Sequence, residues 1–129
     1  MAGFSRYLSR KVLDHVFGTT EYTAPEHIYV ALFTSSTVEC TGTDYAREAC
    51  DVWDAASDVD NSVVKNTAII DFGNAGAGGW GAISHFALFD ALSGTTNALT
   101  DVTALAATKT VNVGDPVTFA AGALQVTLD

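Results

Sequence analysis

Residues 79–90, GWGAISHFALFD, decide the fold of this chain. After the opening glycines comes a run that contains no Gly, Pro or Lys before the closing Asp90. Read at the two-residue period of a strand, the run presents two faces, with Ile83, His85, Ala87 and Phe89 on one and Ala82, Ser84, Phe86 and Leu88 on the other. Because both faces are largely apolar, the pattern predicts a strand over residues 82–90 that is covered on both sides. We expect Phe86 and Phe89 to be buried on opposite faces, one in a sandwich core and one beneath a helix or a neighbouring subunit.

The rest of the chain supplies further short strands. Residues 27–33, HIYVALF, form a second run that is apolar on both faces, and we pair it with residues 82–90 at the centre of a sheet. Shorter strands are predicted at 45–50, 63–64, 68–72, 98–105, 109–113, 117–119 and 124–128. Roughly eight strands with regular turn signals predict a mainly β single domain. Its architecture is an antiparallel β-sandwich or jelly-roll-like barrel over residues 27–128.

One amphipathic helix is predicted at the N-terminus, over residues 4–17. Its apolar side chains recur at helical spacing and are Phe4, Leu8, Val12, Leu13 and Val16. Arg6, Arg10 and Asp14 follow the opposite side, where Arg10 and Asp14 are spaced to form a local ion pair. Gly18 is placed for a left-handed C-terminal cap. A single amphipathic helix needs a surface to lie on, which is either the sheet or another subunit.

Composition limits the classes of function. The chain has 129 residues, of which 48% are hydrophobic and 16% charged, as expected for one folded domain. It contains neither a membrane-length apolar segment nor a signal-peptide pattern, so we expect a protein that is made and used without secretion. A net charge of -9 argues against nucleic acid as a ligand.

Charge is distributed unevenly along the chain. Residues 1–18 carry three basic residues against Asp14, whereas the remainder carries three basic and fourteen acidic residues. A basic N-terminal segment on an acidic body favours docking of that segment on an acidic neighbour, including a second copy of the chain.

Cys40 and Cys50 are the only cysteines, which fits neither a disulfide framework nor a zinc site. A bridge between them is geometrically possible, and two reduced thiols are favoured in the absence of export.

Three motifs suggest chemistry, and each has a simpler explanation. GAGGWG at 76–81 matches G-x-G-x-x-G, but it opens a strand where a dinucleotide site needs a helix. Ser84, His85 and Asp90 suggest a triad, but neighbours in a strand point to opposite faces, so Ser84 and His85 should not meet. A loose calcium site is possible among Asp51, Asp54, Asp58, Asp60 and Asn61, and a solvated acidic loop is favoured. We therefore predict no enzyme, cofactor or metal.

Ordered motifs cover nearly the whole chain. They are Tyr7-Leu8 and KVLDHVF (11–17), IYVALFT (28–34), Gly42-Thr43 with Tyr45-Ala46-Arg47, Trp80-Gly81, SHFALFDA (84–91), KTVNVGD (109–115) and FAAGAL (119–124). With these motifs the chain resembles a family of small tailed-bacteriophage virion proteins, usually labelled tail fibre proteins. It departs from the family where only Asp44 separates Thr43 from Tyr45, in place of a Gly- and Ser-rich insert, and in the acidic stretch 50–60. The resemblance implies a non-enzymatic virion component in several copies, with no catalytic residues to transfer.

Two functions follow from the resemblance. The first is an oligomeric capsid decoration (cement) protein, trimeric by analogy with proteins at threefold points of an icosahedral shell. The second is a tail or tail-fibre component that binds host surface glycans, for which Trp53 and Trp80 are the available tryptophans. Either would be made in the host bacterial cytoplasm, reside in the virion, and contact the major capsid protein or tail proteins and other copies of itself. The central strands have more apolar face than a lone sandwich of this size needs to cover, which favours a partner.

The residues that we expect at interfaces combine the basic and apolar positions of the helix with the large aromatics of the central strand. They are Arg6, Leu8, Arg10, Lys11, Val12, Val16, Trp80, Phe86 and Phe89.

Overall fold

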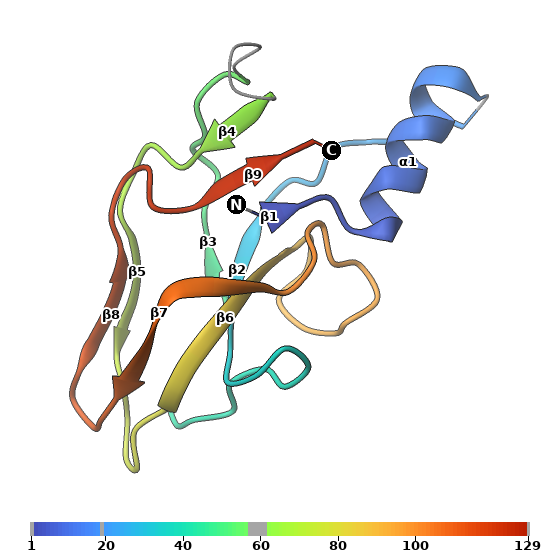
Figure 1. The fold of residues 1–129 in the computed structure, drawn as a ribbon. Helices are drawn as coiled ribbons and strands as arrows, with labels where there is room; N and C mark the ends of the chain where they lie inside the picture. Colours follow the sequence, from blue (N-terminus) through green and yellow to red (C-terminus); the bar gives the residue numbers. More distant parts are fainter. Residues whose placement is uncertain (1, 19, 57–61, 129) are drawn as a thin grey trace.

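A four-stranded antiparallel sheet forms the centre of the computed structural model, which describes residues 2–18, 20–56 and 62–128. Its strand order is β3-β2-β6-β7, and the bounds are β2 (Tyr29–Phe33), β3 (Glu48–Ala49), β6 (Gly81–Phe89) and β7 (Thr103–Val111). Strand β2 runs along the last five residues of β6, from the Tyr29–Phe89 pair to the Phe33–His85 pair (Figure 1). The predicted central strand and its predicted partner are therefore confirmed.

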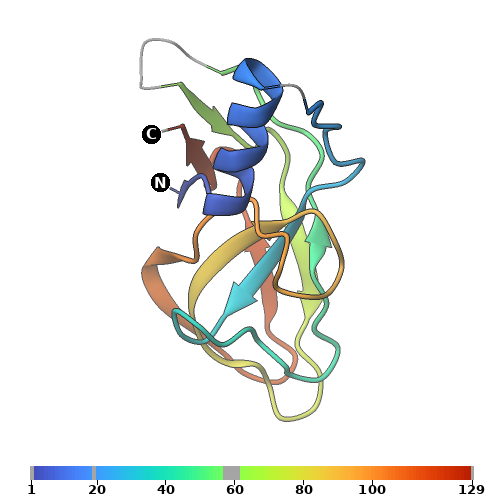
Figure 2. The ribbon, with the colours of Figure 1, turned by 90° about the vertical axis from the view of Figure 1, so that its right-hand side faces the viewer.

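Five shorter strands form the second layer. One sheet has the order β1-β9-β4, with β1 (Ala2–Gly3) parallel to β9 (Gln125–Thr127) and β4 (Val63–Lys65) antiparallel to it. The other joins β5 (Ile70–Asn74) and β8 (Pro116–Phe119). Figures 1 and 2 show these strands facing the four-stranded sheet across the core. The mainly β, single-domain fold with one N-terminal helix is confirmed.

The two faces of β2 and β6 bury side chains in separate clusters. Val30, Leu32, Phe86 and Leu88 join the main core between the layers. Ala31, Phe33, Ala87 and Phe89 form a second cluster with Ala98 and Val102. Phe86 is 5% exposed and Phe89 is 3% exposed, so the predicted burial on both faces is confirmed. The cover over Phe89 is different from the one predicted, because residues of the chain's own 90–102 segment take the place of a helix or subunit. The central strands thus give no argument for a partner.

The pairing of β6 with β7 is irregular, and this corrects two predictions. The segments 98–105 and 109–113 were expected as separate strands, but residues 103–111 form one strand whose register shifts between Ile83 and His85 of its partner. A β-bulge breaks strict alternation of side chains. At this shift Ser84 Oγ lies 2.7 Å from His85 Nδ1, and the expectation that these side chains cannot meet is wrong.

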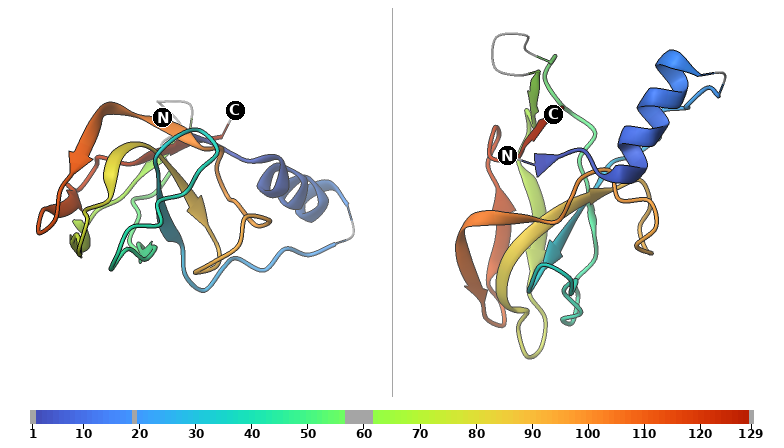
Figure 3. Two further views of the ribbon diagram at one scale, coloured as in Figure 1. Left: turned by 90° about the horizontal axis from the view of Figure 1, so that it is seen from below. Right: turned by 45° about the vertical axis from the view of Figure 1, so that its right-hand side comes forward.

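Helix α1 (Arg6–Phe17) begins two residues later than predicted. Phe4 pairs with Thr100 in an isolated bridge, and Ser5 caps the helix by accepting a hydrogen bond of 3.0 Å from the Leu8 N–H. Gly18 is extended, with φ -99° and ψ -157°, so the predicted left-handed cap is wrong. Among the described residues no ion pair joins Arg10 to Asp14. Figures 1 and 3 show that the N-terminal end of α1 lies beside the sheets and that the rest of the helix projects away from them.

Both cysteines lie in the main core as free thiols, so the disulfide alternative is not formed. Burial raises the pKa of both thiols. Within the described ranges, no helix is long and apolar enough to cross a membrane.

Candidate interaction surface

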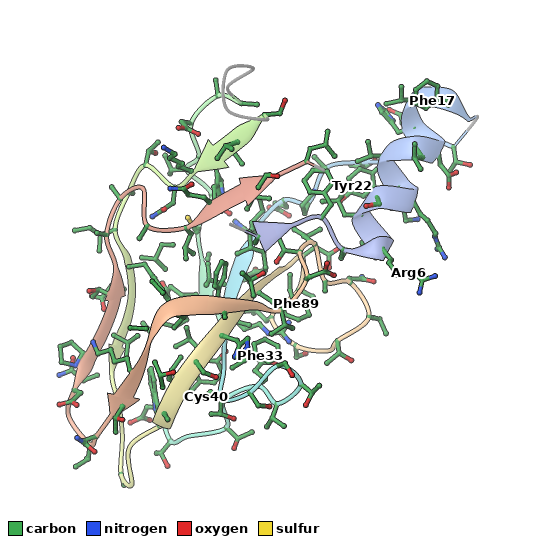
Figure 4. All side chains as sticks on the ribbon, viewed as in Figure 1. Arg6, Phe17, Tyr22, Phe33, Cys40 and Phe89 are labelled. Atoms are coloured by element: carbon green, nitrogen blue, oxygen red, sulfur yellow. The ribbon has the colours of Figure 1, made fainter. Side chains whose placement is uncertain are left out.

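The exposed side chains of α1 form the most prominent apolar feature outside the core. Leu13 is 57% exposed, Val16 60% and Phe17 82%, and none of the helix residues is buried. We call Leu13, Val16 and Phe17 the apolar tip of α1. Phe17 is the one exposed Phe, Tyr or Trp side chain in the described part of the chain. Figure 4 shows it at the far end of the helix.

Arg6 and Arg10, which we call the basic row, lie between this tip and the base of the helix. Arg6 and Arg10 are exposed and lie four residues apart, and Leu13 and Phe17 follow at spacings of three and four. Residues at these spacings lie along one side of a helix. Figure 4 shows Arg6 on the side of α1 that faces away from the sheets. The outward side of α1 therefore changes from cationic at its base to apolar at its tip.

The inner side of α1 is held by the chain itself. Leu8 packs against the main core, and His15 Nδ1 accepts a hydrogen bond of 3.1 Å from the Tyr22 N–H in the returning connector. Tyr22 lies between the helix and the sheets (Figure 4), and burial raises its pKa. These contacts orient α1 from one side only, which leaves the apolar tip and the basic row free.

An open apolar pocket lies at the base of α1. It has a volume of about 280 Å³ and is lined by Phe4, Leu8, Ile28, Trp53, Val64 and Val126, among others. We call it the Trp53 pocket. The indole Nε1–H of Trp53 donates to the Cys50 carbonyl at 2.8 Å, which fixes the ring in the wall of the pocket.

Carboxylates are placed around the Trp53 pocket. Asp51 accepts a hydrogen bond of 3.0 Å from the N–H of the lining residue Ile28, and Asp54 accepts one of 2.7 Å from the Lys65 N–H, next to the lining residue Val64. Both aspartates are exposed, and Asp51 also pairs with His27 at 2.7 Å. An apolar pocket with an acidic rim accepts an apolar group that is flanked by cations.

A buried ion pair covers the outer face of the four-stranded sheet. Arg47 is 5% exposed, and its Nε and Nη2 donate to the two carboxylate oxygens of Glu39 at 2.9 and 2.7 Å. The same guanidinium donates to the carbonyls of Ala91 and Gly94 and lies 3.8 Å from the centre of the Phe89 ring. Arg47 thereby fastens the 90–102 segment over the second apolar cluster.

Tyr45 ties Glu39 to the central strand. Its hydroxyl donates to Glu39 at 2.8 Å and accepts from the Leu32 N–H at 2.9 Å. Burial would raise the pKa of Glu39, but hydrogen bonds from Arg47 and Tyr45 and the guanidinium charge outweigh it and hold the pKa below its ordinary value. Glu39 therefore stays ionised and keeps the Arg47 pair intact at neutral pH.

Trp80 organises the opposite end of the core. Its Nε1–H donates to the Thr43 carbonyl at 2.8 Å, and a Cβ on Gly42 would lie 2.3 Å from its ring. Gly79 has φ +68°, and a Cβ there would lie 2.6 Å from the Val111 carbonyl oxygen. The glycines around Trp80 thus permit close packing, as expected from their position in a strand-opening loop.

A family model described as Podophage GP4 fiber I protein gp80 matches residues 3–127. The chain belongs to this family. The match confirms the resemblance to phage virion proteins and supports a structural role in a phage particle. No curated protein matches the chain.

Several family motifs lie in the interior of this chain. Arg47 and Trp80 are buried, and Tyr45 packs against the main core, so these motif residues mark the fold more than a binding surface. The role of Arg47 was missed by sequence reasoning, although the Tyr45-Ala46-Arg47 motif in the strand predicted at 45–50 was a signal for it. The interface candidates Trp80, Phe86 and Phe89 are enclosed by their own chain and are corrected to core residues.

The helix candidates occupy different positions. Arg6, Arg10 and Val16 are exposed, whereas Leu8, Lys11 and Val12 are half-buried. Leu13 belongs to the same surface and was predicted on the apolar side of the helix but not among the interface candidates, and Phe17 was in neither set. The helical pattern identified the apolar arc of α1, but it did not show which part of that arc the sheets would cover.

No catalytic or metal centre is evident in the residues that the structure describes. Ser84 and His85 form a pair without a carboxylate partner on the ring, and no group of three metal-ligating side chains is present in these residues. Asp51 and Asp54 bind backbone N–H groups. The other members of the possible calcium loop, Asp58, Asp60 and Asn61, lie outside the described residues.

Proposed function

We propose that this chain is a non-enzymatic structural component of a phage fibre, and that it is built into the particle through the outward side of α1. The family description names a fibre protein, which supports the fibre address. The observation that carries the mode of attachment is the apolar tip of α1, with side chains 57–82% exposed on a helix that projects from the domain. Burying one such side chain contributes on the order of 1.5–3 kcal/mol relative to exposure.

The electrostatic character of α1 supports attachment to an acidic protein surface. Arg6 and Arg10 are exposed between the base of α1 and its apolar tip, so a docked partner gains apolar burial at the tip and charge pairing toward the base. Charge complementarity of this kind accelerates encounter and selects partners.

Glycan recognition receives less support. A glycan groove needs exposed aromatic rings beside polar groups, but Trp80 is 4% exposed and its indole N–H binds a backbone carbonyl. Trp53 is half-buried in an apolar pocket with its N–H likewise engaged. Fibre membership is thus proposed without receptor binding by this domain.

Capsid decoration is the second candidate, favoured by the compact sandwich, which resembles no fibrous shaft. The two addresses differ in copy number. Quantitative mass spectrometry of purified virions, with the major capsid protein as internal standard, separates them, and a particle reconstruction locates the chain. A few copies at one vertex support the fibre address. A copy number near that of the major capsid protein would place the chain in the phage head and contradict the fibre address. The threefold state expected from shell geometry applies only in the second case.

A further inference from the structure

The apolar tip of α1 needs a receiving surface that its own chain does not provide. A helix of 12 residues is ~18 Å long, and the half that carries Leu13, Val16 and Phe17 extends beyond the sheets (Figures 1 and 3). Phe17, with 82% exposure, is a single large apolar group at the end of a rigid element. Such a group is suited to insertion into a preformed pocket.

The same chain carries a pocket that fits this group. The Trp53 pocket is open, exposes only apolar surface and has a volume of about 280 Å³. An apolar cavity of roughly 150 Å³ is large enough to bind benzene, so the Trp53 pocket has room for a phenyl ring and part of a neighbouring side chain. Leu8 forms one wall of the pocket, and therefore the tip and the pocket lie at opposite ends of one helix.

Charges on the two surfaces are complementary as well. Arg6 and Arg10 lie on the outward side of α1 between its base and the apolar tip, and Asp51 and Asp54 bind the backbone N–H groups of Ile28 and Lys65 beside the pocket. The N-terminal 18 residues carry three cations against one carboxylate, while the rest of the chain is strongly acidic. A second copy of this chain is thus a partner with both the apolar and the electrostatic counterpart of α1.

We infer that the apolar tip of α1 inserts into the Trp53 pocket of a second copy, with Arg6 and Arg10 against the acidic rim. The contact joins two different surfaces, so it is heterologous and generates a closed ring or an extended chain of copies. A three-membered ring is one closure of this kind. The inference deepens the proposed function, because it names the acidic partner of α1, but it concerns contacts between purified copies and does not depend on the fibre address.

The test measures self-association of the purified chain by sedimentation velocity and light scattering over a range of concentrations. The wild type should associate, and Phe17→Asp should weaken the association about tenfold or more, because a buried phenyl ring is lost. Phe17 is mostly exposed, so this variant should fold normally. Val113→Asp is the matched control, since Val113 is 64% exposed on the turn between β7 and β8 and should leave association unchanged.

A mixing experiment tests the pairing of tip with pocket. Val64→Trp fills the pocket and should also abolish self-association, yet its tip remains intact. Mixing it with Phe17→Asp, whose pocket remains intact, should restore a complex between one copy of each. If Val64→Trp fails to fold, NMR of the Trp53 indole N–H is the alternative test of the pocket. Its resonance should shift with protein concentration in the wild type and stay constant in Phe17→Asp.

Three results would overturn the inference: a monomer at all accessible concentrations, association that survives Phe17→Asp, and equal loss of association in Val113→Asp. None of these bears on where the chain resides in the virion. Conversely, a capsid address in purified virions would contradict the proposed function and leave the contact between copies intact.

Discussion

Replacing Arg47 by Met should remove the fastening of the 90–102 segment while retaining most of the side-chain volume. Breaking a buried ion pair by removing one partner typically costs about 3–5 kcal/mol. Glu39 keeps 22% of its side chain exposed and is partly rehydrated, which lowers the cost. Ala91 and Gly94 lose their hydrogen-bond donor at the same time, at about 1 kcal/mol each. We expect a net loss of about 3–4 kcal/mol, a large fraction of the 5–15 kcal/mol typical of a domain.

Urea unfolding monitored by tryptophan fluorescence measures this loss. Arg47→Lys should also destabilise the protein, because an ammonium cannot bind both oxygens of Glu39 and two carbonyls in the same plane. Lys109→Met is the control: Lys109 is exposed, and its replacement should change the free energy of unfolding by no more than about 0.5 kcal/mol.

Acid should reduce the difference between wild type and Arg47→Met. The pKa of Glu39 is lowered in the folded wild type, so its contribution to stability is present above the ordinary value of 4.5 and is lost as the pH falls through the folded pKa. In the variant the Glu39 carboxylate is partly buried without the guanidinium charge. Its protonation in acid should therefore leave the free energy of unfolding nearly unchanged or increase it. A loss under 1 kcal/mol at neutral pH, or one that does not shrink in acid, would refute the assignment of Arg47 as the fastening residue.

Three further predictions concern other parts of the fold. Gly79→Ala should destabilise the protein by at least about 2 kcal/mol, through a positive φ and a clash with a carbonyl oxygen, whereas Gly78→Ala, with positive φ but open space, should cost about 1 kcal/mol in the same urea assay. Leu8→Asp should lower the melting temperature because Leu8 packs against the core, and Leu13→Asp should leave it nearly unchanged; equal effects would mean that the helix does not sit as described. The hydrogen bond to the Asp51 carboxylate raises the pKa of His27 above its ordinary value of 6.5. The stabilisation from the protonated imidazole is therefore complete below pH 6.5 and is lost as the pH rises through the raised pKa. His27→Asn should remove this pH dependence from the free energy of unfolding measured between pH 6 and 9.

The helix shows where prediction from sequence ended. Its apolar positions and its approximate range follow from the 3.6-residue period. The same period does not distinguish a side chain that packs on a sheet from one that stays exposed. Only the placement of the connector at residues 20–28 and of the sheets divides Leu8, which packs on the core, from Phe17, which does not.

Polar residues inside the fold were the least predictable. Asn66 lies between the predicted strands at 63–64 and 68–72; it is 1% exposed, and its side chain binds the backbone of Ala68, Ala120 and Leu124. Ser84 and His85 meet where the pairing of β6 with β7 loses its register. The bonds of Asn66 to Ala120 and Leu124 join segments that are remote in sequence, so no local pattern predicts them.

What the sequence determined by itself is the set of elements: a central strand that is apolar on both faces, its partner at residues 27–33, a basic amphipathic helix and an acidic remainder. These follow from side-chain period and composition, which are local properties. The tertiary structure alone decided what covers each apolar face. It placed the chain's own 90–102 segment and the Arg47 guanidinium over Phe89, and it left the tip of α1 uncovered. Burial depends on which distant segments return to a surface, and that is settled only when the whole chain is packed.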